Sequence, residues 1–244
     1  MIKIRVDDFP NTKGEPQHTL DAFAKFNDTL LELTGGKKYL LGVIPSRLNT
    51  EAVHFLRNES HCIVGMHGVD HDERYLDAYN NEFPSYLTQY DVRFKMQRGK
   101  DIVENIRKST IYMPPRNIID KRTWDAAKEC GFRYYTVGPE TKFFAKDEFG
   151  KKEYIGGSTK CYENDDNGKL MITTGYKNLY GRTDEISCAN YSQYVTKKEA
   201  YVLTLHWTWE TNIGLEHMKR FFRTSDKDYI LDFDSDIENG DLYV

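Results

Sequence analysis

Short apolar runs with the period of a strand alternate along this chain with longer segments whose apolar residues recur at helical spacing. At the start, Ile2, Ile4 and Val6 alternate with Lys3 and Arg5, which predicts a β-strand. Further strands are expected over residues 39–44, 61–66, 110–113, 132–137 and 200–205. Helices are expected over residues 16–34, 50–56, 85–106, 120–131 and 214–224. Because strand and helix alternate, we predict parallel strands joined by right-handed crossovers.

The pattern weakens between residues 139 and 198. Gly156-Gly157, Asn164-Asp-Asp-Asn-Gly168 and Gly175 interrupt short apolar runs there, which is typical of hairpins and loops. We expect this insertion to lie over one end of the main domain. Because the chain shows neither an internal repeat nor a linker, residues 1–244 are expected to form a single domain of the α/β class.

Charge and composition argue against several function classes. The 244 residues carry a formal net charge of −4 and no basic stripe, which argues against nucleic-acid binding. No apolar run approaches the roughly 20 residues that span a bilayer, and Met1 runs directly into the first strand without a secretory signal. We therefore expect a cytoplasmic protein without a membrane partner. Its four scattered cysteines are expected to be reduced thiols.

Polar residues with catalytic chemistry stand where predicted strands end. Asp7 and Asp8 close the first strand, His67 and His71 follow the third, and His206 follows the last. Because parallel α/β folds gather their active sites at the carboxyl ends of strands, we expect these side chains to lie together. Neighbouring side chains of a strand point to opposite faces, so the turn after the first strand has to bring its two carboxylates together. The alternative interpretation of the pair is an ordinary turn before a proline.

His67 and His71 have a spacing that suits a metal site. A helical turn after the strand would place both imidazoles on one side, and Gly68 allows a tight turn. With one carboxylate the set becomes His, His and Asp with an open coordination position, which is typical of catalytic zinc. A second carboxylate is then a candidate base, and His206 is the candidate acid for a leaving amine. Zinc is the first choice among divalent transition metals, whereas iron, manganese, cobalt and nickel stay open. The alternative is a pair of ordinary surface histidines.

In this order the motifs resemble those of the polysaccharide deacetylase superfamily, which includes NodB-homology proteins, carbohydrate esterase family four and divergent intracellular relatives. The matching motifs are Asp7-Asp8, His67-Gly-Val-Asp-His71 and Leu203-Thr-Leu-His206. The resemblance implies a distorted (β/α)7 barrel, with the segment 139–198 as its hairpin and loop insertion. It also implies that Asp7 is the base and His206 the acid. The metal ligands that it implies are Asp8, His67 and His71.

The third motif departs from the family pattern, in which an arginine usually precedes proline and an aromatic residue. Here the segment reads Tyr112-Met-Pro-Pro-Arg-Asn117, with the arginine after the prolines. The resemblance to the intracellular branch implies that Pro115 lines the site. Arg116 and Asn117 are equal candidates for the partner of the base. Trp207 is expected either to wall the substrate pocket or to pack in the core.

We therefore predict a metal-dependent hydrolase that removes an N-acyl group, with acetyl as the first expectation, from an amino sugar or a nucleotide-linked sugar. Water bound to the metal would attack a linear amide C–N bond, with an aspartate as base and a histidine as acid. One alternative keeps the metal and hydrolyses a non-sugar C–N bond. Another is a glycan-binding barrel whose site has lost its activity.

Overall fold

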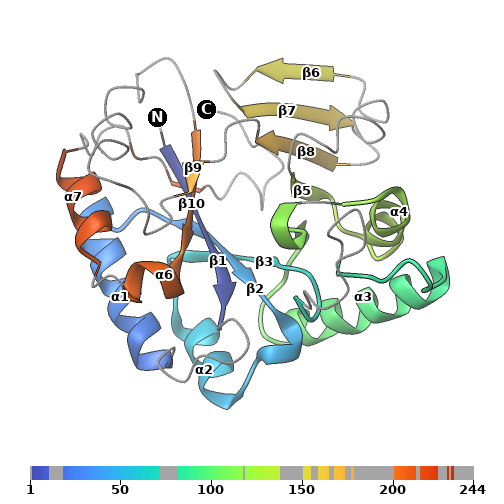
Figure 1. Ribbon diagram of the computed structural model, residues 1–244, viewed down its shortest axis with the longest axis horizontal. Helices are drawn as coiled ribbons and strands as arrows, with labels where there is room; N and C mark the ends of the chain where they lie inside the picture. Colours follow the sequence, from blue (N-terminus) through green and yellow to red (C-terminus); the bar gives the residue numbers. More distant parts are fainter. Residues whose placement is uncertain are drawn as a thin grey trace.

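The computed structural model describes residues 2–10, 19–71, 82–117, 119–137, 151–154, 159–164, 168–173, 177–178, 201–212, 215–224, 230 and 232–233. The strands within these ranges form one sheet in the order β6-β7-β8-β5-β4-β3-β2-β1-β10-β9. Six parallel strands make its centre: β10 (Tyr201–His206), β1 (Ile2–Phe9), β2 (Tyr39–Val43), β3 (Cys62–Met66), β4 (Ile111–Tyr112) and β5 (Tyr134–Val137). This central sheet curls into an open barrel (Figure 1), which confirms the predicted distorted barrel type.

Helices cover the outer face of the curled sheet (Figure 1). They are α1 (Leu20–Thr34), α2 (Thr50–Asn58), α3 (Gln89–Glu104), α4 (Lys121–Glu129), α6 (Trp207–Asn212) and α7 (Glu216–Thr224). Two short 3-10 helices, η1 (Pro45–Arg47) and η3 (Pro115–Asn117), follow β2 and β4. The apolar periodicity predicts all of the longer helices among the described residues. It does not predict α6, which begins directly after β10.

Polar side chains at the helix starts explain where the helices begin. Thr88 and Asp91 form a capping box at α3, because the Thr88 hydroxyl accepts from the Asp91 amide while the Asp91 carboxylate accepts from the Thr88 amide. The side chains of Thr19 and Asp120 cap α1 and α4 by accepting from the backbone amides of Ala22 and Thr123. At α2 the cap is Asn49, whose side chain accepts from the Ala52 amide.

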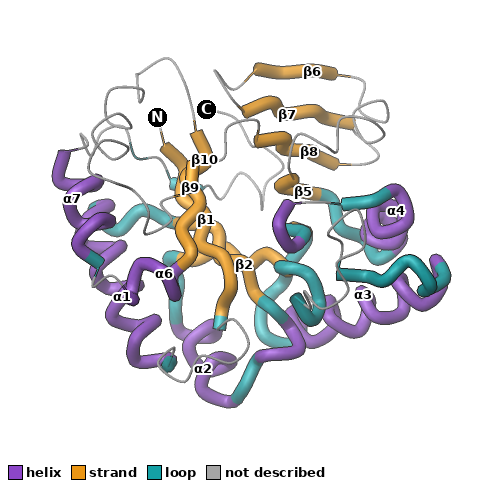
Figure 2. The backbone as a smooth tube through the Cα atoms, in the orientation of Figure 1, coloured by secondary structure: helices purple, strands orange, loops and turns teal. Residues whose placement is uncertain are grey.

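The segment 139–198 contributes strands to the sheet itself. β8 (Gly168–Thr173) pairs in parallel with β5, and β7 (Thr159–Asn164) and β6 (Lys151–Tyr154) continue from it as antiparallel strands. On the opposite side of the sheet, β9 (Lys177–Asn178) pairs with β10. The predicted hairpins are therefore present at β6–β8, where they extend the edge of the sheet beyond β5 (Figure 2), and the predicted loops of this segment lie outside the described residues.

The two faces of β1 have different environments, and both are buried. Ile4 and Val6 belong to the main apolar core, which lies between the sheet and the helices. Arg5 points the other way, because its guanidinium reaches the Thr136 hydroxyl on β5, three strands beyond β2 in the sheet. A side chain that joins β1 to β5 has to cross the interior of the curl. Although its sequence alternates like a half-exposed strand, β1 therefore carries a polar side chain into the interior of the barrel.

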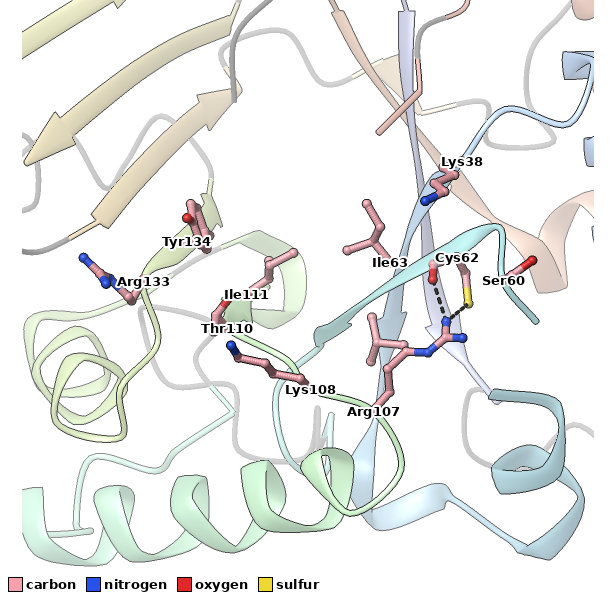
Figure 3. Close-up of a pocket in the computed structure, with 11 residues that line it drawn as sticks. Lys38, Ser60, Cys62, Ile63, Arg107, Lys108, Thr110, Ile111, Arg133 and Tyr134 are labelled. Carbon is pink, nitrogen blue, oxygen red and sulfur yellow. Dashed lines mark hydrogen bonds between the residues drawn. The ribbon is translucent and has the colours of Figure 1, made fainter. Parts of the chain in front are cut away.

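A cavity of about 600 Å³ opens at the amino ends of the central strands (Figure 3). Its walls include Cys62, Ile111 and Tyr134, the first residues of β3, β4 and β5. Arg107 lies beside it and donates to the carbonyl oxygen of Cys62 at 2.8 Å. The aspartates and histidines of the sequence motifs stand at the carboxyl ends of the strands. The cavity is therefore at the opposite end of the barrel from the candidate chemistry.

Two of the four cysteines have described side chains, and both are buried free thiols. Burial raises the pKa of Cys62 to about 12 and that of Cys130 to about 11, so both stay protonated at neutral pH. Cys161 and Cys188 fall outside the described side chains. Among the described helices, no segment has the length and apolar character that a membrane span needs.

Glu210 on α6 is expected to make the protein less stable as the pH rises. Its side chain is fully buried, and within the described part of the chain neither carboxyl oxygen has a hydrogen-bond partner. Burial raises its pKa to about 8 from an ordinary value of 4.5. Between these two values the unfolded chain releases a proton that the folded protein keeps, so the free energy of unfolding falls as the pH rises.

Glu210→Gln should remove this penalty and stabilise the protein by on the order of 3 kcal/mol at the upper end of that range, with little effect at the lower end. Urea unfolding at both ends of the range measures the difference. Exposed Glu51 provides a matched control, since Glu51→Gln should change stability by less than about 0.5 kcal/mol at either pH. A pH-independent effect of Glu210→Gln would contradict the assignment.

Candidate metal and catalytic site

Asp7 and Asp8 reach one site because β1 contains a bulge. Val6 pairs with Leu41 and Phe9 pairs with Val43, so the two aspartates stand opposite a single residue of β2. Asp8 takes the left-handed φ of 70°, which is uncommon for a residue other than glycine. A bulge of this kind re-aims a side chain, and it allows two neighbouring carboxylates to face the same point. Bulges and left-handed residues are frequent at functional sites.

His67 and His71 converge without the helical turn that their spacing suggested. His67 follows β3 directly, and its amide donates to the Val43 carbonyl at 2.7 Å. The loop over 67–71 is irregular, with positive φ angles of 64° at Gly68 and 48° at His71. The two imidazole rings nevertheless lie 4.9 Å apart, centroid to centroid. The predicted helical turn is therefore wrong, whereas the predicted convergence of the histidines is confirmed.

Three donor atoms at this point fit a metal ion. Nε2 of His67 and Nε2 of His71 each lie 3.3 Å from Oδ1 of Asp8. Bonds of about 2 Å at tetrahedral angles separate ligand atoms by roughly the same distance. Oδ1 of Asp8 is buried and has no hydrogen-bond partner among the described residues, a state that a cation would relieve. The three side chains can therefore hold a divalent metal, and three protein ligands leave one coordination position open.

The surrounding backbone fixes the orientation of these ligands. Nδ1 of His67 lies 2.9 Å from the Met113 carbonyl oxygen. Because a carbonyl only accepts, Nδ1 carries the proton, and the lone pair of Nε2 faces Asp8 and the metal position. The indole Nε1 of Trp207 donates to the backbone carbonyl of Asp8 at 3.0 Å. Trp207 is fully buried and packs its ring edge-on against Phe23. It therefore supports the bulge from the core side.

Arg5 is the partner of Asp7, and the sequence motifs did not identify it. Its Nε and Nη2 donate to Oδ1 and Oδ2 of Asp7 at 2.6 and 2.8 Å, a bidentate pair. Its Nη1 donates to Oδ1 of Asn117 at 2.6 Å and to Oγ1 of Thr136 at 2.5 Å. All four side chains are buried. Arg116, the other candidate for this role, has an exposed side chain. The signal for Arg5 was its position two residues before Asp7 in a strand, which places both side chains on one face.

The charges of the site favour ionised carboxylates. Burial alone would raise the pKa of Asp7, but the neighbouring Arg5 guanidinium and the imidazoles of His67 and His206 outweigh it, and the pKa is lowered. Burial also opposes ionisation of Asp8, and the three histidines overcome it in the same way, so the pKa of Asp8 is strongly lowered. For His67, burial acts to lower the pKa, but the carboxylates of Asp7 and Asp8 raise it above its ordinary value. The site thus stabilises negative charge on both aspartates, as cation binding requires.

His206 closes the site on the side nearest to solvent. It pairs across the sheet with Asp7, and its Nε2 lies 3.9 Å from Oδ2 of Asp8. Its side chain is 18% exposed, compared with 2% for Asp7 and His67. A molecule that enters from solvent would therefore meet His206 before the buried carboxylates.

The third motif lies beside the site in η3. Pro115 is buried, and a Cβ added to Gly68 of the histidine loop would come within 2.6 Å of its ring. Asn117 is buried and reaches Asp7 through Arg5. Both Arg116 and Asn117 have positive φ angles, of 54° and 62°. The structure thus brings Pro115 and Asn117 to the site, whereas the side chain of Arg116 faces solvent.

No protein-family model matches the chain, and no curated protein matches its sequence. Its fold does match solved structures. A family 4 acetyl xylan esterase from Clostridium thermocellum, solved with a cobalt ion, has a TM-score of 0.53 and 11% sequence identity over 91% of this chain and 83% of its own. A protein from Mycobacterium smegmatis described as a polysaccharide deacetylase has a TM-score of 0.58 and 14% identity over 94% of this chain and 85% of its own.

A third match carries a different activity. The 4-alpha-glucanotransferase from Thermococcus litoralis has a TM-score of 0.58 and 10% identity, over 94% of this chain and 38% of its own. The fold expected from the resemblance to polysaccharide deacetylases is confirmed by these matches. Because the same fold occurs with more than one reaction, the fold alone does not determine the function.

Proposed function

We propose that this protein is a metal-dependent hydrolase of the polysaccharide deacetylase superfamily, with residues 1–244 as one catalytic domain. It removes an N-acyl group, acetyl in the first instance, from an amino sugar or a nucleotide-linked sugar by cleaving a linear amide C–N bond. The observation that carries the proposal is the convergence of Asp8, His67 and His71 next to a second, arginine-held carboxylate. A glycan-binding barrel would have no need for that second carboxylate.

The metal ligands in this proposal are Asp8, His67 and His71, with zinc as the first choice. A divalent ion there would supply Lewis acidity, which polarises an acyl carbonyl and makes water more acidic. Asp7 lies next to this position, with its Oδ2 4.0 Å from Nε2 of His67. The bidentate bond to Arg5 keeps Asp7 ionised and fixes its plane, and each carboxylate oxygen retains a second lone pair. Asp7 is therefore the base that takes a proton from the attacking water.

His206 is the acid in this proposal. It stands at the end of β10 opposite Asp7, and its partial exposure would allow the imidazole to reach the nitrogen of an entering amino sugar. In its protonated form Nε2 donates a proton to the departing amine. Without that proton the nitrogen would have to depart as an anion, which is a poor leaving group. The base and the acid thus act from two neighbouring strands.

The substrate contacts expected from the sequence are Pro115, Arg116, Asn117 and Trp207. Trp207 is fully buried against Phe23 and supports the bulge instead, so the proposal keeps the other three. Pro115 and Asn117 border the histidine loop and the Asp7–Arg5 pair, and exposed Arg116 offers a positive charge beside them. That charge would suit the phosphate of a nucleotide-linked sugar. A cytoplasmic location remains part of the proposal, because a nucleotide-linked substrate is found there.

Metal content tests the proposal most directly. We expect about one transition metal ion per chain in the purified protein, and its loss in an Asp8→Ala/His67→Ala double variant. Addition of a chelator should abolish release of acetate from N-acetylated sugars and their nucleotide conjugates, and zinc or cobalt should restore it.

Three results would separate the alternatives. Metal binding with activity only on non-sugar amides would move the assignment to a different C–N substrate. Activity on O-acetyl sugars alone would make the protein an esterase. If the protein takes up no metal even after exposure to zinc and cobalt, the proposal is wrong and a glycan-binding role replaces it.

A further inference from the structure

Glu82 contacts the histidine loop at its backbone. Its two carboxylate oxygens lie 2.8 and 2.9 Å from the amide nitrogen of Val69, and Oε2 also accepts from the amide of His71 at 3.1 Å. The side chain is buried, with 6% of its surface exposed. One carboxylate thus satisfies two amides of the irregular loop that carries both histidines, where no helix or strand supplies a partner.

The loop is shaped to fit this carboxylate. A Cβ added to Gly68 would lie 2.3 Å from Oε2 of Glu82, so the carboxylate occupies the space that any other residue would need. Gly68 also has a φ of 64°, which glycine adopts without strain. The glycine between the two histidines therefore serves both the turn and the approach of Glu82.

Glu82 is itself held by the adjoining segment. Arg122 at the start of α4 donates to the carbonyl oxygens of Phe83 and Leu87 at 2.7 Å and of Pro84 at 2.9 Å. This guanidinium fixes the chain that follows Glu82 against α4. The position of the carboxylate is therefore set by a part of the fold that the metal site does not include.

The carbonyl groups of the same loop are held by a different element, η1. Nη2 of Arg47 in η1 donates to the carbonyl oxygens of Asp70 at 3.1 Å and of His71 at 3.2 Å. Lys95 on α3 pairs with the Asp70 carboxylate at 3.1 Å. His71 thus has its amide bound by Glu82 and its carbonyl bound by Arg47. These two contacts support a residue whose φ of 48° is otherwise unfavourable.

We propose that Glu82 is a positioning residue for the metal site, which holds His71 in its ligating conformation through the loop amides. The proposal rests on the proposed metal centre and adds a residue that neither binds the metal nor meets the substrate. Without Glu82, the loop would relax to a conformation with negative φ at His71. The His71 imidazole, one of the three proposed ligands, would then move away from the metal position. Loss of groups that orient metal ligands typically lowers metal affinity by roughly 10- to 100-fold.

The test is the dissociation constant for zinc, measured by competition with a chromogenic chelator in the absence of substrate. Glu82→Ala removes all three contacts and should raise this constant by roughly 10- to 100-fold. Glu82→Gln keeps the shape and one acceptor but turns an amide donor toward Val69, so it should give an intermediate increase. Thermal unfolding of the metal-free proteins identifies any general loss of structure, and Glu82→Gln serves if the alanine variant does not fold.

Glu59 provides a matched control away from the site. Its carboxylate also accepts from a backbone amide, that of His61 at 2.7 Å, and from the Asn27 side chain at 2.8 Å. Glu59→Gln should therefore lower stability while leaving zinc affinity unchanged. If both Glu82 variants bind zinc like the unaltered protein, or if Glu59→Gln weakens binding equally, the positioning role is wrong.

The readout separates this inference from the proposed function. A protein that binds zinc in a Glu82-dependent manner but deacetylates no sugar would retain the inference and overturn the function. A protein that deacetylates sugars but whose zinc affinity is unchanged in both Glu82 variants would retain the proposed function and overturn the inference. Failure of the unaltered protein to bind zinc or cobalt would overturn both.

Discussion

An Asp7→Asn variant is expected to keep its metal and to lose turnover by about 10²- to 10⁴-fold, the usual contribution of a general base. Asparagine has the shape of aspartate but cannot take a proton from water. The three proposed metal ligands do not include Asp7, since both of its oxygens bind Arg5 at 2.6 and 2.8 Å. Metal content should therefore stay at the level of the unaltered protein.

The matched comparison for Asp7→Asn is the variant Asp8→Asn. Asp8 is the neighbouring residue, but its Oδ1 faces both metal-site histidines at 3.3 Å. This variant should lose metal and activity together, and added zinc should restore part of both. Steady-state kinetics with metal analysis of the same samples distinguish the two aspartates. If Asp7→Asn retains full turnover with metal bound, the assignment of the base is wrong.

The sequence predicts most of the fold because its parallel strands are short apolar runs between amphipathic helices. Val43, Met66 and Leu205 lie in such runs, and the proline or histidine that closes each run indicates where the strand ends. Since those ends meet at one edge of a parallel sheet, the strand pattern is enough to predict that the candidate ligands lie together. What the pattern missed is α6, because a helix of six residues is too short to show a period.

The details of the site depend on backbone conformations that the pattern does not encode. The bulge at Asp7 and Asp8 requires a φ of 70° at an aspartate, and the histidine loop requires a φ of 48° at His71. Both are held by tertiary contacts, from the Trp207 indole in one case and from Glu82 in the other. The alternating charged residues of β1 are typical of a strand with one solvent-facing side, whereas the curl of the sheet buries them. Whether a sheet curls closed depends on contacts between residues that are far apart in the sequence. The local alternation of apolar and charged residues in β1 therefore could not show whether the charged face meets water or a polar interior.

Arg5→Met should produce the largest loss of stability among the single substitutions considered for this site, about 3–5 kcal/mol in urea unfolding at neutral pH. Methionine keeps much of the length of arginine but removes the charge and every donor. Asp7, with 1% of its surface exposed, would then be a buried carboxylate without its bidentate partner. The acceptors on Asn117 and Thr136 would lose the same guanidinium. Removal of one member of a buried pair costs more than the pair itself contributes, because the remaining charge stays desolvated.

A double-mutant cycle tests whether Asp7 is the source of that loss. Arg5→Met combined with Asp7→Asn removes both charges of the pair, so the double variant should be more stable than the sum of the two single losses predicts. Exposed Arg116 supplies the control, since Arg116→Met should cost less than about 1 kcal/mol and should not couple to Asp7→Asn. Strong coupling of Arg116, with none for Arg5, would return the role of base partner to the third motif. The geometry predicts strong coupling between Arg5 and Asp7 and none between Arg116 and Asp7.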